Sequence, residues 1–244
     1  MDLKNKNILV TGGAVRVGRA ITTGLADAGA RVFCHYFADE QAARELASEI
    51  RRKGFEIELI QGDLRRLDEI SRVVETVVKE GGSIDVLVNN AAIFFRTPLG
   101  NISEEEWDTL FTMNLKSPFF CSQCAGNHMR RQGYGKIVNI GDPSGLNPWP
   151  GFIPYGITKS GIISMTKGLA KALAPEVQVN CINPGPVMFP GNYTDADKKR
   201  ALDATLLKRE GSPHDIAAAV RFLIAGSDYI TGSVLNIDGG RSIA

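Results

Sequence analysis

The sequence predicts an α/β protein of one domain, in which a doubly wound parallel sheet carries helices on both faces. Short apolar runs alternate with amphipathic helical patterns along all 244 residues, and no repeat or linker interrupts them. Some runs, such as residues 86–88, are apolar at every position, which is typical of strands buried on both faces. A chain of this length commonly forms a single α/β domain.

The predicted elements follow one another in regular order. Apolar and β-branched runs predict strands over residues 7–10, 31–36, 56–61, 85–89, 136–140, 177–182 and 234–237. Periodic patterns predict helices over residues 17–29, 39–52, 67–80, 104–131, 155–174 and 213–225. The longest helix should begin after Ser103, because Glu106 stands at the capping-box position. Strand–helix–strand connections of this kind run right-handed and leave the strands parallel.

Composition excludes several classes of function. The net charge of +1 argues against nucleic acid or an anionic membrane as an obligate partner. Residues 1–6 are polar, and no apolar run is long enough to span a bilayer, so we expect a cytoplasmic protein. The four cysteines, Cys34, Cys121, Cys124 and Cys181, are then expected as reduced thiols. The CxxC formed by Cys121 and Cys124 lies in a helical pattern with no nearby His pair, so we expect neither redox chemistry nor a metal site.

The segment 188–210 breaks the alternation after the sixth strand. It is polar at first and then becomes a helical run rich in Lys and Arg. Long insertions at this place in an α/β sheet often close over a ligand, so we expect a substrate lid. A solvated loop followed by a surface helix is the alternative.

Residues 11–18 form a glycine-rich turn between the first strand and the first helix. Gly12 and Gly18 let the backbone approach a pyrophosphate, and the helix N-terminus behind them offers unpaired N–H groups, with Val17 beside the ligand. Strand, glycine loop and helix in this order predict a Rossmann-type dinucleotide site. Arg16 stands where a third glycine is usual and can bind cofactor phosphate.

The second strand indicates which dinucleotide binds. It ends in His35 and Tyr36 and not in an Asp or Glu, which would bind the ribose hydroxyls of NAD and repel a 2′-phosphate. The absence of that carboxylate, with Arg16 and His35 nearby, favours NADPH. Asp39 lies slightly further on and keeps NAD open.

Tyr155 and Lys159 begin a helix beyond the fifth strand. Their i,i+4 spacing places both side chains on one helix face. We expect the ammonium group to lower the pKa of the phenol, so that Tyr155 can exchange a proton near neutral pH. The carboxyl end of an open sheet, where ligands bind, is where this pair should lie.

At this point the chain resembles the short-chain dehydrogenase/reductase family over essentially its whole length. The motifs that carry the resemblance are residues 11–18, 63–64, 89–91, 114, 155–159, 183–185, 230–232 and 238–240. The resemblance implies nicotinamide hydride transfer with Tyr155 as proton donor, Lys159 on the nicotinamide ribose, and Asn114 supporting a water relay to Lys159. It also implies cofactor contacts from Asp63, Leu64, Asn89, Asn90, Ala91, Pro184 and Gly185. Purely structural roles remain open for Asp63, Asn89 and Asn114.

The chain departs from the family's usual pattern at Asp142, where a serine normally precedes the tyrosine. A carboxylate there opposes negative charge developing on a carbonyl oxygen, whereas it suits a ring nitrogen that gains a proton. The alternative is that Asp142 caps the strand end and Ser144 replaces the usual serine.

Four features are similar to the pteridine reductase branch of the family. They are Arg16 in the glycine loop, the His35–Tyr36 pair, Phe94 after the Asn-Asn-Ala motif, and Asp142. The resemblance implies that Phe94 stacks on a pterin, and we expect Arg16, Tyr155, Val187 and Met188 as further substrate contacts. A 3-oxoacyl thioester reductase and a non-catalytic dinucleotide-binding module are the alternatives. Resemblance to the family also implies a homotetramer.

Overall fold

The computed structural model describes residues 1–244 and contains one sheet of seven parallel strands in the order β3-β2-β1-β4-β5-β6-β7. The strands are β1 (Asn7–Val10), β2 (Arg31–Tyr36), β3 (Ile57–Gln61), β4 (Val86–Asn89), β5 (Gly135–Ile140), β6 (Val177–Pro184) and β7 (Val234–Ile237). The order changes direction between β1 and β4, and the crevice at such a switch point is where open α/β sheets bind ligands. The predicted fold class is therefore confirmed.

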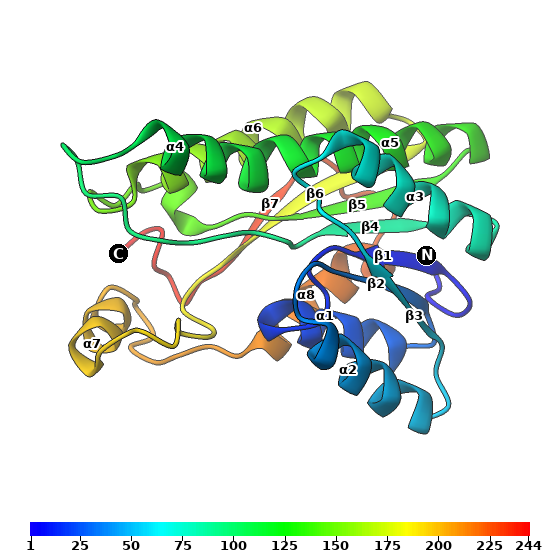
Figure 1. Ribbon diagram of the computed structural model, residues 1–244, viewed down its shortest axis with the longest axis horizontal. Coiled ribbons are helices and arrows are strands. Elements are labelled where there is room, and N and C mark those ends of the chain that lie inside the picture. The colour runs from blue at the N-terminus through cyan, green and yellow to red at the C-terminus, as the bar shows by residue number, and fades with distance from the viewer.

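Helices cover both faces of the sheet (Figure 1). One layer holds α1 (Arg16–Ala26), α2 (Glu40–Arg52) and α8 (Pro213–Arg221), and the other holds α3 (Leu67–Gly81), α4 (Glu104–Phe111), α5 (Ser117–Gln132) and α6 (Ile153–Leu173). Side chains alternate across β1 accordingly: Ile8 and Val10 join the apolar cluster on one face and Leu9 joins the cluster on the other. None of these helices is both long and apolar enough to cross a membrane.

The expected helix over residues 104–131 is interrupted in the structure. Its start is confirmed, because Ser103 Oγ accepts from the Glu106 N–H at 3.1 Å and Glu106 Oε2 accepts from the Ser103 N–H at 2.9 Å. Residues Thr112–Lys116 form a π-helical turn between α4 and α5. A second π turn, Phe222–Gly226, follows α8. Such turns insert one extra residue, often at functional sites, and apolar periodicity does not predict them.

The segment 188–210 lies apart from the sheet and contains α7 (Asp195–Asp203) (Figure 1). Two arginines from distant parts of the chain donate hydrogen bonds to this segment. Arg16 Nη2 donates to the Met188 carbonyl at 3.0 Å, and Arg241 Nη1 donates to the Ala201 carbonyl at 2.9 Å. The glycine loop and the C-terminal residues are therefore both tied to this segment.

Candidate active site

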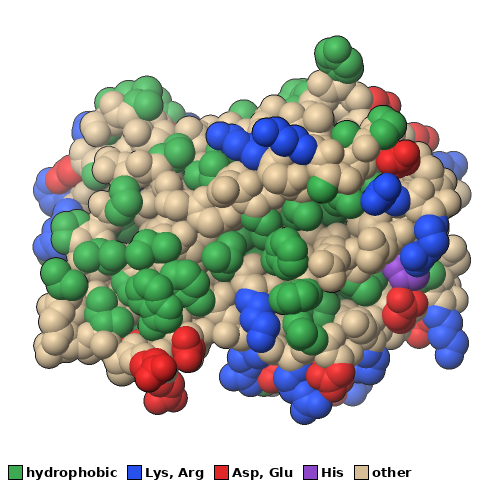
Figure 2. All heavy atoms as spheres, turned by 90° about the horizontal axis from the view of Figure 1, so that it is seen from above, with side chains coloured by type: hydrophobic (Ala, Val, Ile, Leu, Met, Phe, Trp, Pro, Cys, Tyr) green, Lys and Arg blue, Asp and Glu red, His purple; other side chains and the backbone are tan.

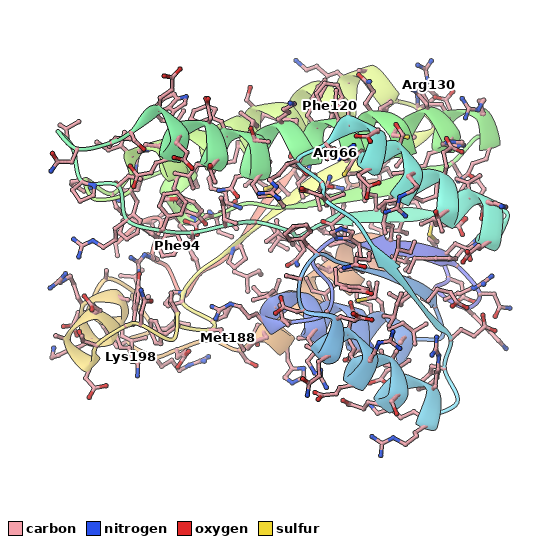
Figure 3. All side chains as sticks on the ribbon, in the orientation of Figure 1. Arg66, Phe94, Phe120, Arg130, Met188 and Lys198 are labelled. Carbon is pink, nitrogen blue, oxygen red and sulfur yellow. The ribbon has the colours of Figure 1, made fainter.

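A cleft of about 580 Å³ opens at the carboxyl ends of the central strands. Figure 3 shows Phe94 and Met188, which both line it, on opposite sides of the opening. Of the predicted site residues, the following line this cleft: Gly12, Arg16, Val17, Gly18, His35, Tyr36, Asp63, Leu64, Asn90, Ala91, Phe94, Asp142, Tyr155, Lys159, Pro184, Gly185, Val187 and Met188. Asn114 is buried and does not line it.

The glycine loop fits a pyrophosphate. A Cβ atom on Gly18 would fall 2.0 Å from the Gly12 carbonyl oxygen and 2.6 Å from Asn90 Nδ2, so only glycine permits this close packing. No side chain caps the N-terminus of α1 at Val15, which leaves its first N–H groups available to an anion. Arg16 has a left-handed backbone with φ of 53°, which explains why glycine is usual at its position.

His35 is a neutral side chain that is hydrogen-bonded to the glycine loop. Its Nδ1 accepts from the Gly12 N–H at 3.1 Å, and its Nε2 lies 3.0 Å from the Gly62 carbonyl oxygen, to which it donates. Burial lowers the pKa of His35 to about 4. His35 therefore contributes to the dinucleotide site by positioning Gly12, and it does not supply the positive charge that its place in the sequence suggested.

Arg65 lines the cleft beside Asp63, and the sequence did not predict it as a site residue. Its guanidinium binds Asp63 through two contacts, Nε to Oδ1 at 2.8 Å and Nη2 to Oδ2 at 2.7 Å. It also lies 5.1 Å from the centre of the Phe37 ring. This hydrogen bonding lowers the pKa of Asp63. The sequence does not predict this role, because a charged residue in a loop gives no indication of which side chain it pairs with.

Asp142 faces Tyr155. The Tyr155 hydroxyl donates to Asp142 Oδ2 at 3.0 Å, while Asp142 Oδ1 accepts from the Ser144 N–H at 2.7 Å. The Ser144 hydroxyl is buried and has no hydrogen-bond partner, so it does not replace the usual serine. Asp142 both caps the short turn Pro143–Gly145 and occupies the position beside the phenol.

The expected lowering of the Tyr155 pKa is wrong for this structure. Burial and the neighbouring Asp142 carboxylate instead raise the pKa of Tyr155 well above its usual value. The Lys159 ammonium lies 5.6 Å from the centre of the Tyr155 ring and donates to the Ile140 carbonyl at 3.0 Å. Burial lowers the pKa of Lys159, and Asp142 acts in the opposite direction. Tyr155 is therefore held protonated.

Asn114 braces the chain beside the site. Its Oδ1 accepts from the Ile93 N–H at 2.9 Å and its Nδ2 donates to the Ile93 carbonyl at 2.9 Å. No hydrogen bond joins the side chains of Asn114 and Lys159. The π turn that contains Asn114 thereby fixes the segment that leads to Phe94.

The side chain of Asn89 lies outside the cleft, which favours the structural role left open for it. Its side chain is buried within the sheet layer, where Nδ2 donates to Ser122 Oγ at 2.8 Å and to Asn139 Oδ1 at 2.8 Å. The neighbouring Asn90 does line the cleft, and its Nδ2 donates to the carbonyls of Thr11 and Gly12 at 2.9 Å each. Side chains alternate along a strand, so only one of two adjacent asparagines can face the ligand.

Aromatic side chains form the wall of the cleft around Tyr155. Phe94 stacks on Phe152 with ring centres 4.7 Å apart and 7° between planes, and it meets Tyr155 edge-on at 4.9 Å. Trp149 packs edge-on against Phe152 at 6.0 Å. One face of Phe94 is thus covered by Phe152, and the wall suits a flat ring. Trp149 and Phe152 were missed because they lie in an irregular loop without periodicity.

The CxxC cysteines lie outside the cleft. Burial raises the pKa of Cys121 to about 12, which keeps its thiol protonated. Cys124, Glu75 and His128 offer ligand atoms within 4.8 Å of one another. His128 is already bound at both ring nitrogens, by Glu75 at 2.7 Å and Arg131 at 2.9 Å. All four cysteines are free thiols.

The glycine loop, the Tyr155–Lys159 pair and the aromatic wall define a dinucleotide-dependent oxidoreductase. The family model described as Enoyl-(Acyl carrier protein) reductase matches residues 13–242. A 3-oxoacyl-[acyl-carrier-protein] reductase FabG of Staphylococcus epidermidis is 37% identical over 240 residues, which cover 97% of this chain and 98% of the relative. The chain belongs to the short-chain dehydrogenase/reductase family, and it is an enzyme.

Solved structures agree with this assignment. A Serratia marcescens short-chain dehydrogenase/reductase superposes with a TM-score of 0.94 at 31% identity, covering 99% of this chain and 100% of the other. FolM, an alternative dihydrofolate reductase from Brucella canis complexed with NADP, superposes with a TM-score of 0.93 at 30% identity, covering 100% of this chain and 96% of the other. A metagenomic blue fluorescent protein in complex with NADPH has a TM-score of 0.92 at 32% identity, covering 99% of each chain.

Proposed function

We propose that this enzyme reduces a pteridine, of dihydropterin or dihydrofolate type, with NADPH. The observation that carries the proposal is the 3.0 Å hydrogen bond from Tyr155 to Asp142. A carboxylate beside the proton donor disfavours charge developing on a carbonyl oxygen and favours a nitrogen that becomes protonated. The likeness to FolM, whose description names dihydrofolate reduction, supports the same substrate class.

NADPH would lie between the glycine loop and the aromatic wall and supplies hydride when bound. Gly12, Val17 and Gly18 with the N-terminus of α1 would hold its pyrophosphate, and Lys159 its nicotinamide ribose. The preference for NADPH over NAD is supported by the guanidinium group of Arg16 and by the neighbours described with NADP or NADPH. Asp39 also lines the cleft.

Each side chain at the reacting centre then has one task. Tyr155, which its raised pKa keeps protonated, would give this proton to the ring nitrogen as the adjacent carbon is reduced. Asp142 orients that hydroxyl and stabilises positive charge on the ring. Phe94 offers its uncovered face to the ring, and Val187 and Met188 close the cleft from the other side.

Reduction of a 3-oxoacyl thioester is the second candidate. It is favoured by the curated relatives, because a FabG of Staphylococcus aureus is also 36% identical over 96% of this chain and 97% of the relative. In that reaction Tyr155 would protonate a carbonyl oxygen, and the Asp142 carboxylate would oppose the oxyanion.

A substrate panel tests the proposal. NADPH oxidation is followed with dihydrobiopterin, dihydrofolate and a 3-oxoacyl thioester at equal enzyme concentration. Turnover of at least one pterin with a higher kcat/KM than the thioester supports the proposal. Turnover of the thioester alone assigns the second candidate.

Two further proposals concern shape and assembly. We propose that segment 188–210 is a substrate lid, because Met188 and Ala201 of this segment line the cleft.

We also propose a homotetramer, since apolar side chains gather on the face formed by α4, α5 and α6 (Figure 2). Trp107, Phe119 and Ile157 on these helices are exposed. Sedimentation equilibrium tests the assembly.

A further inference from the structure

Arg241, which follows β7 near the C-terminus, lines the same cleft as Tyr155 and Asp142. Figure 1 shows the C-terminus between α7 and the ends of α4 and α6. The Arg241 guanidinium lies 4.4 Å from the centre of the Trp149 ring, and Nη1 donates to the Ala201 carbonyl at 2.9 Å. The guanidinium is therefore fixed between the aromatic wall and segment 188–210.

Arg241 has no carboxylate partner within ion-pair distance. Its Nε is buried without a hydrogen-bond acceptor, and burial lowers the pKa of the guanidinium. The two carboxylates whose charge acts on the pKa of Arg241 are Asp142 and Asp238, and both are hydrogen-bonded to other groups. Asp142 accepts from Tyr155 and the Ser144 N–H, and Asp238 accepts from the N–H groups of Gly240 and Ser242. Placing a cation in a partly buried site without an anion is unfavourable, so a ligand that brings the anion is the simplest partner.

Arg96 is a second guanidinium near the aromatic wall, outside the lining of the cleft. It is exposed, makes no ion pair, and lies 6.0 Å from the centre of the Phe152 ring. Tyr193 also lines the cleft, and the positive charges of Arg96 and Arg241 both act to lower its pKa against the larger effect of burial, which raises it. The aromatic wall thus carries Asp142 beside Tyr155 and two unpaired cations along its Trp149–Phe152 side.

This distribution of charge matches a substrate with a flat ring that is protonated and a side chain that is anionic. Guanidinium groups form strong, charge-assisted hydrogen bonds with carboxylates, and Arg241 lines the cleft without an ion-pair partner. We propose that Arg241 binds a carboxylate on the side chain of the substrate, so that the enzyme prefers folate-type substrates to pterins with an uncharged side chain. Arg96 adds long-range attraction at the edge of the cleft. This inference rests on the pteridine reduction proposed above.

The experiment compares dihydrofolate, which has a glutamate tail, with dihydrobiopterin, whose side chain is uncharged. Steady-state kcat and KM are measured for the wild type, Arg241→Met, Arg241→Lys and Arg130→Met. Arg130 is an exposed arginine on α5, and Figure 3 shows it at the far end of the molecule from Phe94. In Arg241→Met the ratio of kcat/KM for dihydrofolate to that for dihydrobiopterin should fall about 10- to 100-fold, chiefly through the KM for dihydrofolate. The ratio for Arg241→Lys should lie between those of the wild type and Arg241→Met, and Arg130→Met should keep the wild-type ratio.

A measurement on the wild type alone guards against variants that do not fold. Added salt should raise the KM for dihydrofolate and leave the KM for dihydrobiopterin nearly constant, because only the first substrate is bound by charge attraction. If both pterins are reduced but the ratio survives Arg241→Met and salt, the inference about Arg241 is overturned and the proposed function stands. If neither pterin is reduced, the proposed function fails and the inference falls with it.

Discussion

The phenolic hydroxyl of Tyr155 donates to Oδ2 of Asp142 across 3.0 Å, and this bond adds to the effect of burial on the pKa of Tyr155. Because the carboxylate accepts the phenolic proton and repels a phenolate, it raises the pKa of Tyr155 in the same direction as burial does. The phenol of Tyr155 is therefore held protonated in the absence of a ligand.

Replacement of Tyr155 by Phe should remove the proton donor while keeping the ring. We expect kcat to fall by about 10²- to 10⁴-fold, the usual contribution of a positioned general acid. Tyr134→Phe is the matched control, because it also removes a hydroxyl that donates to an aspartate, Asp85, but lies outside the cleft. A Tyr155→Phe enzyme within tenfold of the wild-type kcat would contradict the role of Tyr155.

Gly18→Ala should disrupt the glycine loop. The added Cβ would overlap the Gly12 carbonyl, so the loop must move and the Kd for NADPH should rise by at least tenfold. Gly168→Ala is the control: Gly168 is exposed in α6, a Cβ there meets nothing within 4 Å, and Ala should raise the free energy of unfolding by about 0.5–1 kcal/mol. Fluorescence titration with NADPH measures the Kd of both variants, and urea denaturation measures the stability of Gly168→Ala. An unchanged Kd in Gly18→Ala would show that the loop does not hold the dinucleotide.

Much of this site follows from the alternation of strands and helices. Parallel strands end at one edge of the sheet, so residues placed directly after β1, β4 and β5 converge there whatever lies between them. Arg241 and Trp149 did not follow, because they belong to irregular segments whose path depends on tertiary packing. The pKa of Tyr155 could not be predicted from the Lys159 spacing, since it depends on burial and on the orientation of Asp142.

The backbone of Arg16 predicts different stabilities for two small replacements. Its φ of 53° is unfavourable for any residue with a Cβ, so Arg16→Gly should unfold with a free energy about 1 kcal/mol higher than Arg16→Ala. Both variants lose the contact with the Met188 carbonyl, so that loss cancels in the comparison. Urea denaturation measures the difference, and equal stabilities would mean that this backbone conformation is not strained.

His35 predicts how stability depends on pH. Its pKa is about 4 in the folded protein and 6.5 ordinarily, so between these values the unfolded chain binds a proton that the folded chain does not. Stability should therefore fall as pH decreases from 6.5 to 4, with His35 contributing about 1.4 kcal/mol per pH unit at most. In His35→Asn the free energy of unfolding should vary less steeply over this window. The same steepness in both proteins would show that His35 is not held neutral.

The charge on Asp142 is the centre of the account, and Asp142→Ser tests it most directly. The kcat/KM of wild type and variant is measured with dihydrofolate, dihydrobiopterin and a 3-oxoacyl thioester, with Asp142→Asn as the variant that removes charge but keeps shape. With the pterins, the kcat/KM of Asp142→Ser should fall about 10²-fold or more, and that of Asp142→Asn should fall as well. Pterin reduction that survives Asp142→Ser, or a thioester activity that rises in it above any pterin activity of the wild type, would contradict the account.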